Sequence, residues 1–241
     1  MQAELEDCLV LAYALPAETL EPHVGPGLTL DRHGPWGFVA VALVQARAMR
    51  PAGAPRRMGQ DFFLAGYRIF TRYRTKAGRT LRGLRILRSD TDSRRMAWAG
   101  NLLTGYHYHR CRVTSDASPG RLSYRVRSGD GASDLMVVAD LTRTPGPPPG
   151  SPLRDLREAR RFAGPLPFTF GFEAETRSMV VVEGRHPAWD PVPVTIRQAD
   201  VAFLAHRFPE AEPVLANAFH VRDVPYLWTR GWREGLPEDV Q

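Results

Sequence analysis

Residues 96–113 read MAWAGNLLTGYHYHRCRV, and this stretch decides how the rest of the chain is interpreted. Trp98, Ala99 and Leu102 fall on one face of a short helix, because residues three and four apart lie on the same side. Gly105 suits the end of such a helix, since glycine tolerates the left-handed backbone found at helix C-termini. The stretch therefore predicts a helix, a glycine and then a strand, and we expect it to line a ligand pocket.

The strand predicted after Gly105 has a period of two, so successive side chains point in opposite directions. One face carries Tyr106, Tyr108, Arg110 and Arg112, and the other carries His107, His109, Cys111 and Val113. Two tyrosines and two histidines in four residues are unusual for a surface strand, although both types are normal in half-buried strands. The pattern indicates a polar pocket wall and leaves open which face points inward.

Length and composition are those of an ordinary globular chain, with 241 residues of which 43% are hydrophobic. We predict a single domain over 1–241, with a Pro/Gly-rich connection at about 144–152. No apolar run reaches the roughly 18 residues that a membrane span needs. The apolar run at 8–15 is too short for a secretory signal, and two cysteines make no disulfide framework. We therefore expect a cytoplasmic protein with no membrane partner.

The basic residues do not indicate nucleic-acid binding, although the net charge is +6. Lys76 is the only lysine, and the arginines are scattered rather than gathered in a dense run. The alternating Arg68, Arg72 and Arg74 offer one basic stripe, which keeps nucleic acid as a third and weaker hypothesis. We expect no nucleic-acid partner.

Short apolar segments separated by Gly and Pro predict mainly strands and few helices. The expected strands are 8–15, 28–30, 36–49, 64–75, 79–88, 106–113, 121–127, 134–143, 168–172, 178–183, 192–197 and 219–228. The expected helices after the first half are 152–162, 199–207 and 209–218. This order predicts a mainly β fold, an antiparallel β-barrel or cone with a few short helices, because closure removes exposed sheet edges.

The central stretch also resembles the acetoacetate decarboxylase-like proteins. Residues 100–102 and 105–107 (GNL and GYH) stand where that family carries Gly-Arg-Glu and Gly-Tyr-Pro, and Tyr108 stands at its lysine. In the family, this lysine forms a Schiff base with a β-keto acid. A phenol cannot form an imine, and Asn101 and Leu102 replace the Arg-Glu pair. The resemblance implies the family's cone-like barrel without its lysine chemistry.

A second resemblance covers almost the whole chain. It is carried by 13–17 (YALPA), 25–28 (GPGL), 186–191 (HPAWDP), 213–215 (PVL) and 221–228 (VRDVPYLW). Their order is similar to the uncharacterised YqjF-like family, domain-of-unknown-function family 2071 (COG2071), of the acetoacetate decarboxylase-like superfamily. The chain departs from this family at Leu64, where a glutamate is expected. The family has no established activity, so the resemblance implies a fold and not a reaction.

The single lysine bears on the mechanism. Lys76 lies in the predicted turn 75–79, and turns are solvated. A Schiff-base lysine needs desolvation or a neighbouring cation to lower its pKa. We therefore predict that the chain is not a Schiff-base decarboxylase, and whether it is an enzyme stays open, with no catalytic residue assigned.

The first functional hypothesis is a barrel cavity that binds a small acidic or carbonyl-bearing molecule. Its predicted ligand-binding residues are Arg68, Arg85, Tyr106, His107, Tyr108 and His109. An arginine in such a cavity can hold a carboxylate through two parallel hydrogen bonds. The alternative is a non-catalytic structural or interaction protein whose barrel is filled by its own side chains, with a homo-oligomer open in either case.

Metal and cofactor sites have little support in the sequence. His107 and His109 could present two imidazoles on one face, with His186 or His220 as a third ligand, but no spacing demands it. No phosphate-binding glycine loop or Gly-x-Ser-x-Gly elbow occurs. We therefore expect no metal and no cofactor, and we expect His186 and Trp189 to plug the barrel.

Overall fold

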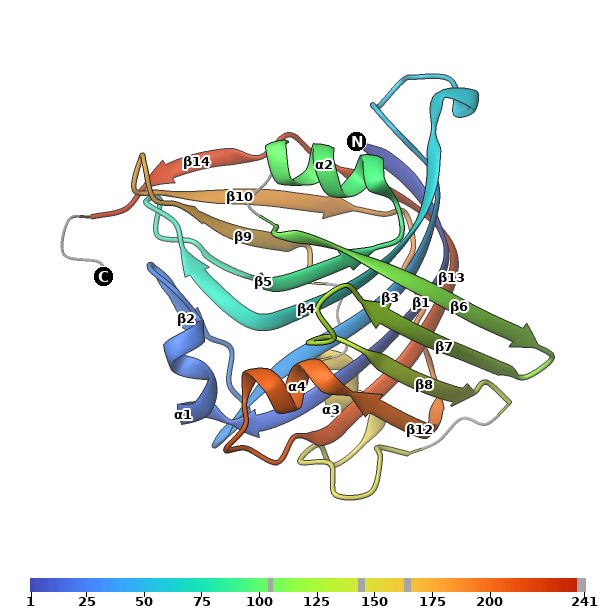
Figure 1. The fold of residues 1–241 in the computed structure, drawn as a ribbon. Helices are drawn as coiled ribbons and strands as arrows, with labels where there is room; N and C mark the ends of the chain where they lie inside the picture. The colour runs from blue at the N-terminus through green and yellow to red at the C-terminus, as the bar shows by residue number, and fades with distance from the viewer. Residues whose placement is uncertain (104–105, 143–145, 163–165, 238–241) are drawn as a thin grey trace.

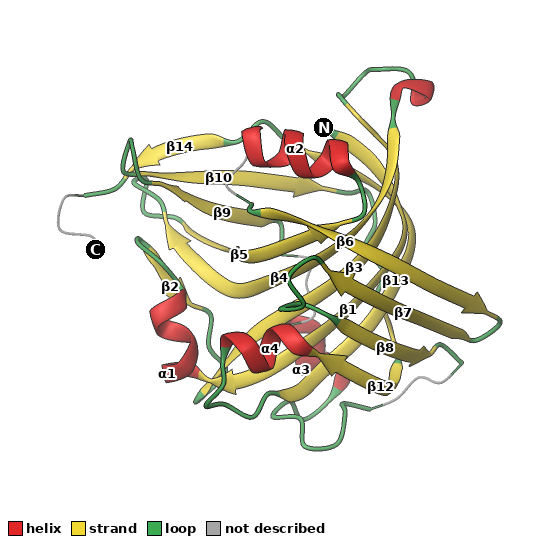
Figure 2. Ribbon diagram, viewed as in Figure 1, coloured by secondary structure: helices red, strands yellow, loops and turns green. Residues whose placement is uncertain are grey.

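The computed structural model describes residues 1–103, 106–142, 146–162 and 166–237, and the strands dominate it (Figures 1 and 2). The strands are β1 (Gln2–Pro16), β2 (Leu28–Leu30), β3 (Trp36–Arg50), β4 (Gln60–Arg74), β5 (Thr80–Thr91), β6 (Tyr108–Ser118), β7 (Arg121–Ser128), β8 (Leu135–Asp140), β9 (Phe168–Glu173), β10 (Ser178–Arg185), β11 (Val192–Pro193), β12 (Thr195–Val201), β13 (Val214–Trp228) and β14 (Trp232–Gly235). The helices are α1 (Ala17–Leu20), α2 (Arg94–Leu103), α3 (Leu156–Arg161) and α4 (Ala202–Arg207), with short 3-10 turns η1 (Glu21–His23) and η2 (Arg56–Met58).

Hydrogen bonding closes seven strands into a ring in the order β5, β9, β10, β13, β1, β3, β4 and back to β5. A branch of β6, β7, β8 and β12 continues from β5 and lies in front of the ring (Figure 1). The predicted mainly β fold with a few short helices is confirmed. The sheet is mixed, because β5 runs parallel to both β6 and β9. Parallel neighbours need a crossover connection, and α2 supplies it between β5 and β6.

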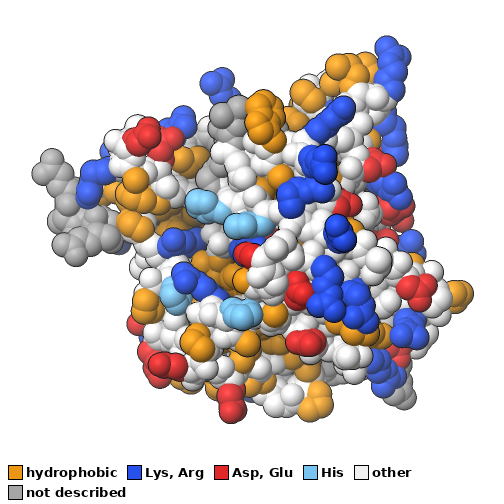
Figure 3. Space-filling model, viewed as in Figure 1, with side chains coloured by type: hydrophobic (Ala, Val, Ile, Leu, Met, Phe, Trp, Pro, Cys, Tyr) orange, Lys and Arg blue, Asp and Glu red, His pale blue; other side chains and the backbone are white. Residues whose placement is uncertain are grey.

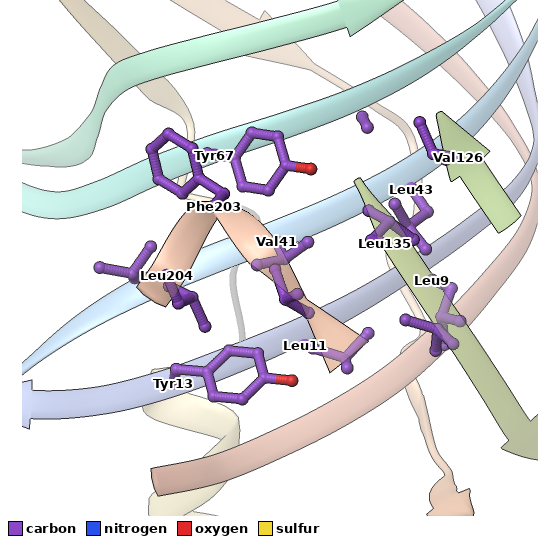
Figure 4. Close-up of a cluster of buried hydrophobic side chains, with 14 of the residues drawn as sticks. Leu9, Leu11, Tyr13, Val41, Leu43, Tyr67, Val126, Leu135, Phe203 and Leu204 are labelled. Atoms are coloured by element: carbon purple, nitrogen blue, oxygen red, sulfur yellow. The ribbon is translucent and has the colours of Figure 1, made fainter. Parts of the chain in front are cut away.

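The central ring strands are buried on both faces, which explains their nearly continuous apolar sequence. In β3, residues 38–44 are all buried. One face packs against the branch and α4, where Tyr67 stacks on Phe203 with ring centroids 4.2 Å apart (Figure 4). The opposite face carries a second apolar cluster, which includes Cys8, Phe38 and Phe219. A polar side chain on this second face is therefore surrounded by ring strands.

The helix predicted at 209–218 is wrong, because β13 already begins at Val214. The Ala-rich segment has good helix propensity, but its buried positions pair with β1 over the full length of that strand. Tertiary pairing thus overrides a weak local preference. The predicted helix at 199–207 is shortened to α4 because its first residues belong to β12.

The Pro/Gly-rich connection does not separate two sheets. Strands on either side of it pair directly, as β5 does with β9 and β1 does with β13. Its residues 144 and 145 lie outside the described part of the chain, and the single-domain boundary stays a prediction. None of the described helices is long and apolar enough to cross a membrane.

Candidate functional site in the strand ring

The turn from α2 into β6 positions Tyr108. Ser93 Oγ accepts a hydrogen bond from the Met96 amide at 3.2 Å and satisfies one free amide at the start of α2. At the other end, Asn101 accepts from the Tyr108 amide at 2.6 Å and donates to the Tyr108 carbonyl at 2.9 Å. Gly100 lies against the Tyr108 ring, where any Cβ would overlap it. Asn101, which replaces the arginine of the resembling motif, therefore holds the Tyr108 backbone. Gly105, predicted to end this helix, lies outside the described residues, as do the side chains of Ala99 and Leu102.

The tyrosines point inward and the histidines point outward. Tyr108 is only 9% exposed, and the Tyr106 ring lies 6.3 Å from it. The Tyr106 hydroxyl and Thr169 Oγ1 on β9 are hydrogen-bonded at 3.0 Å. His107 and His109 are exposed, so they do not join the tyrosines. His107 has φ +48°, an uncommon left-handed backbone, just before β6 begins.

Arg68 on β4 lies beside these tyrosines. Its Nε is buried and has no hydrogen-bond partner among the described residues. Burial raises the pKa of Tyr106 and of Tyr108, and the Arg68 charge opposes part of each rise. Burial likewise raises the pKa of the Cys8 thiol to about 12, again opposed by Arg68. A cationic group thus lies among neutral hydroxyl and thiol groups.

Tyr226 on β13 completes the cluster, and it was not predicted. Its hydroxyl approaches Gly184, where a Cβ would overlap it, and burial raises its pKa against the Arg68 charge. The Tyr226 ring lies 6.0 Å from His186, which lies 5.4 Å from Trp189. The only sequence signal for Tyr226 is its place inside the motif at 221–228.

The segment with His186 and Trp189 covers the second apolar cluster from outside. Trp189 packs edge-on against Phe219 with centroids 6.4 Å apart. His186 Nδ1 and Trp189 Nε1 are both buried without a hydrogen-bond partner in the described chain. Buried polar atoms are normally paired, so three such atoms around one cluster mark a site that can accept polar partners.

Arg85 lies on the other face of the ring, which separates it from Arg68. Arg68 pairs with Ile86, and the adjacent Ile69 pairs with Arg85. Adjacent residues of a strand point to opposite faces, so the two arginines do as well. Of the six predicted ligand-binding residues, the structure brings together Arg68, Tyr106 and Tyr108. It places His107, His109 and Arg85 elsewhere.

The lysine and the histidines considered as metal ligands also lie apart from this cluster. Lys76 is exposed in the β4–β5 turn, where its amide donates to Glu234 at 3.0 Å. His220 is buried and contacts Asp7 at 2.8 Å instead of approaching the exposed His107 and His109. Within the described ranges, no group of three or more His, Cys, Asp or Glu side chains is arranged to hold a metal ion.

Comparison with known proteins agrees with this architecture. Residues 2–222 match the family DUF2071, described as an uncharacterized conserved protein (COG2071). The chain belongs to the DUF2071 family. A search of the curated proteins finds no match.

Solved structures that are similar to this DUF2071 protein share its fold. Acetoacetate decarboxylase from Legionella pneumophila matches with a TM-score of 0.61 and 11% identity, over 98% of this chain and 88% of its own. The enduracididine biosynthesis enzyme MppR complexed with pyruvate matches with a TM-score of 0.61 and 13% identity, over 96% of this chain and 89% of its own. An acetoacetate decarboxylase-like enzyme from Sphingomonas wittichii RW1 matches with a TM-score of 0.51 and 18% identity, over 95% of this chain and 89% of its own. The predicted DUF2071 membership is confirmed by the family match, and the solved structures show that the chain shares their fold.

Proposed function

We propose that this DUF2071 protein binds a small carboxylate-bearing molecule, such as a 2- or 3-keto acid, among Arg68, Tyr106, Tyr108 and Tyr226. The observation that carries the proposal is the buried Arg68 Nε without a hydrogen-bond partner in the described chain. A guanidinium presents its donors as a planar fork, which matches the two oxygens of a carboxylate. A carboxylate would therefore supply the acceptors that Arg68 lacks.

The tyrosines fit the second half of such a ligand. Because burial raises the pKa of Tyr106, Tyr108 and Tyr226, all three hydroxyls stay protonated at neutral pH and can donate hydrogen bonds. A ketone oxygen accepts such bonds, and a buried donor of this kind can also act as a general acid. A structural relative, MppR, has been solved with pyruvate, a molecule that carries both groups.

The proposed site works without a Schiff base. In the resemblance to acetoacetate decarboxylase-like proteins Tyr108 stands at the position of their lysine, and Lys76 lies in an exposed turn. We therefore expect pyruvate to bind reversibly and to leave no covalent adduct. Electrospray mass spectrometry after incubation with pyruvate and borohydride tests this, since reduction of an imine would add a stable mass to the chain.

Isothermal titration calorimetry with pyruvate tests the binding site. We expect saturable binding by the wild-type protein and at least about tenfold weaker binding by Arg68→Gln, since a charge-assisted hydrogen bond is worth about 1.5–3 kcal/mol. Arg112→Gln is the matched control, because Arg112 is exposed on β6. Equal affinity of Arg68→Gln and the wild type would overturn the proposal. Absence of binding by the wild type would favour a ring filled by its own side chains.

A further inference from the structure

A second group of basic side chains lies on the opposite face of the ring from Arg68. Arg85 projects from β5, Arg207 ends α4 and His23 ends η1. The Arg207 Nη2 atom lies 3.1 Å from His23 Nδ1, a distance at which the guanidinium donates to a neutral imidazole. His23 is fixed from its other side by Phe208, with ring centroids 5.3 Å apart. Three elements that are distant in sequence therefore bring their basic groups together.

The Arg85 side chain is held by its neighbours and does not extend freely into solvent. It is half-buried, and its guanidinium lies against Gly25, where any side chain would overlap it. Gly25 has φ +83°, so the same residue also meets a backbone demand that glycine meets best. The GPGL turn at 25–28 thus reserves the space that the Arg85 guanidinium occupies.

No carboxylate neutralises this cluster within the described chain. Neither Arg85, Arg207 nor His23 takes part in any of the ion pairs found there, although a charge that is partly buried, as that of Arg85 is, is usually paired. The cluster also repels itself. Burial, followed by the charge of Arg207, lowers the pKa of both Arg85 and His23, and Arg85 lowers that of His23 further. Folding therefore holds like charges together at a cost in free energy.

We infer that Arg85, Arg207 and His23 form a binding site for the phosphate group of a small phosphorylated molecule, separate from the Arg68 site. A phosphate group carries up to two negative charges and accepts hydrogen bonds from several directions, so it suits donors that converge from three elements. Figure 3 shows basic and histidine side chains at the surface of the face that carries α4, and the exposed Arg207 keeps the cluster accessible to solvent. The bound group would replace repulsion between the two arginines by attraction to both of them.

Calorimetric titration with inorganic phosphate and with glycerol 3-phosphate tests this inference at constant ionic strength. We expect saturable binding of both by the wild type and at least about tenfold weaker binding by Arg85→Gln and by Arg207→Gln. Arg207 is exposed, so its variant folds even if Arg85→Gln does not. Arg112→Gln is again the control and should bind phosphate like the wild type.

Two results would overturn the inference. One is wild-type phosphate affinity in Arg207→Gln. The other is a heat signal that sodium chloride of equal ionic strength reproduces, which would show general screening of charge. Binding of glycerol 3-phosphate but not of inorganic phosphate would support the inference and show that the ester part also contacts the protein. Arg68→Gln should leave phosphate binding unchanged, which separates this site from the carboxylate site.

Discussion

Two arginines of adjacent ring strands, the buried Arg88 and the half-buried Arg68, differ completely in their partners. Arg88 on β5 donates to Asp90 at 2.9–3.1 Å and to Asp130 at 2.7 and 2.9 Å. Asp90 is fully buried and also accepts from Ser133 Oγ at 2.7 Å. Arg68, one strand away on β4, has a buried Nε with no partner in the described chain.

This difference separates a structural charge from a charge that can serve a ligand. The acceptors of Arg88 come from the chain itself and join β5 to the turn between β7 and β8, so the network fixes the branch against the ring. Arg68 has hydroxyls and a thiol as neighbours, and these compensate a charge poorly. Substitutions in the Arg88 network should therefore lower the free energy of unfolding much more than a substitution of Arg68.

The largest expected effect follows from breaking the Arg88 network. Asp90→Ala leaves the buried Arg88 with one partly exposed carboxylate, and removal of one member of a buried ion pair costs about 3 kcal/mol or more. Urea unfolding followed by circular dichroism measures the loss. Asp116→Ala, at an exposed position on β6, is the control and should stay within about 0.5 kcal/mol of the wild type. A similarly small change for Asp90→Ala would show that the network does not stabilise the fold.

The two regions should lose stability at opposite ends of the pH scale. The Arg88 guanidinium holds the pKa of Asp130 well below its usual range, so this contribution is present above about pH 4 and is lost as the pH falls. Burial raises the pKa of Tyr108, so this contribution is present below about pH 10 and is lost as the pH rises.

Urea unfolding at several pH values tests this contrast with one variant for each region. The stability difference between the wild type and Asp130→Asn should shrink between pH 5 and pH 2 (about the range of the shift). Relative to Tyr108→Phe, the wild type should lose up to about 1.4 kcal/mol per pH unit above pH 10. Parallel pH profiles of the wild type and both variants would contradict the two pKa shifts.

A smaller effect is expected where the site meets β9. Tyr106→Phe removes the hydrogen bond to Thr169 and should lower the free energy of unfolding by about 1 kcal/mol. Tyr124→Phe is a useful control, because Tyr124 is also buried and packs on Phe63, and its side chain makes no hydrogen bond within the described chain. Equal costs for both variants would mean that the Tyr106 contact adds nothing beyond packing.

The smallest change in stability is expected for Arg68→Met, and it distinguishes Arg68 from Arg88 most directly. Arg68→Met should leave stability within about 0.5 kcal/mol of the wild type or raise it, because a half-buried side chain whose buried Nε has no partner among the described residues is replaced by an apolar one. Arg88→Met, measured beside it by urea unfolding, should destabilise the protein, since Asp90 then stays buried and unpaired. If Arg68→Met costs as much as Arg88→Met, Arg68 has a structural role and the proposed ligand site loses its main support.

Much of the fold follows from local patterns, but the site does not. The β4–β5 hairpin is readable from its apolar segments and its Lys76–Gly78 turn, and the short helix before β6 is readable from Trp98 to Gly105. Trp98 itself is 72% exposed, so the apolar face predicted for that helix is not simply the buried one. Periodicity gives the type of an element more reliably than its orientation.

The membership of the site depends on contacts that periodicity does not encode. The pairing of β4 with β5 skips one β5 residue between Tyr67 and Arg68. Arg88 and Arg85 of β5 therefore pair with Tyr67 and Ile69 and lie on the same face of the ring. The left-handed backbone of His107 similarly precedes the point where β6 joins the ring. Tyr226 comes from a strand more than a hundred residues away from Tyr108 in the sequence. These side chains meet only because the ring closes.

Ring closure also has a consequence for synthesis of the chain on the ribosome. β1 lies between β3 and β13 in the ring, and its residues pair with positions from Val214 to Leu227. β1 therefore emerges about 200 residues before β13 and has one uncovered edge until β13 pairs with it. Contacts at such long separation slow folding and leave strand edges open to pairing with other chains. We expect the nascent protein to depend on chaperones that hold β1 and β3 until β13 has emerged.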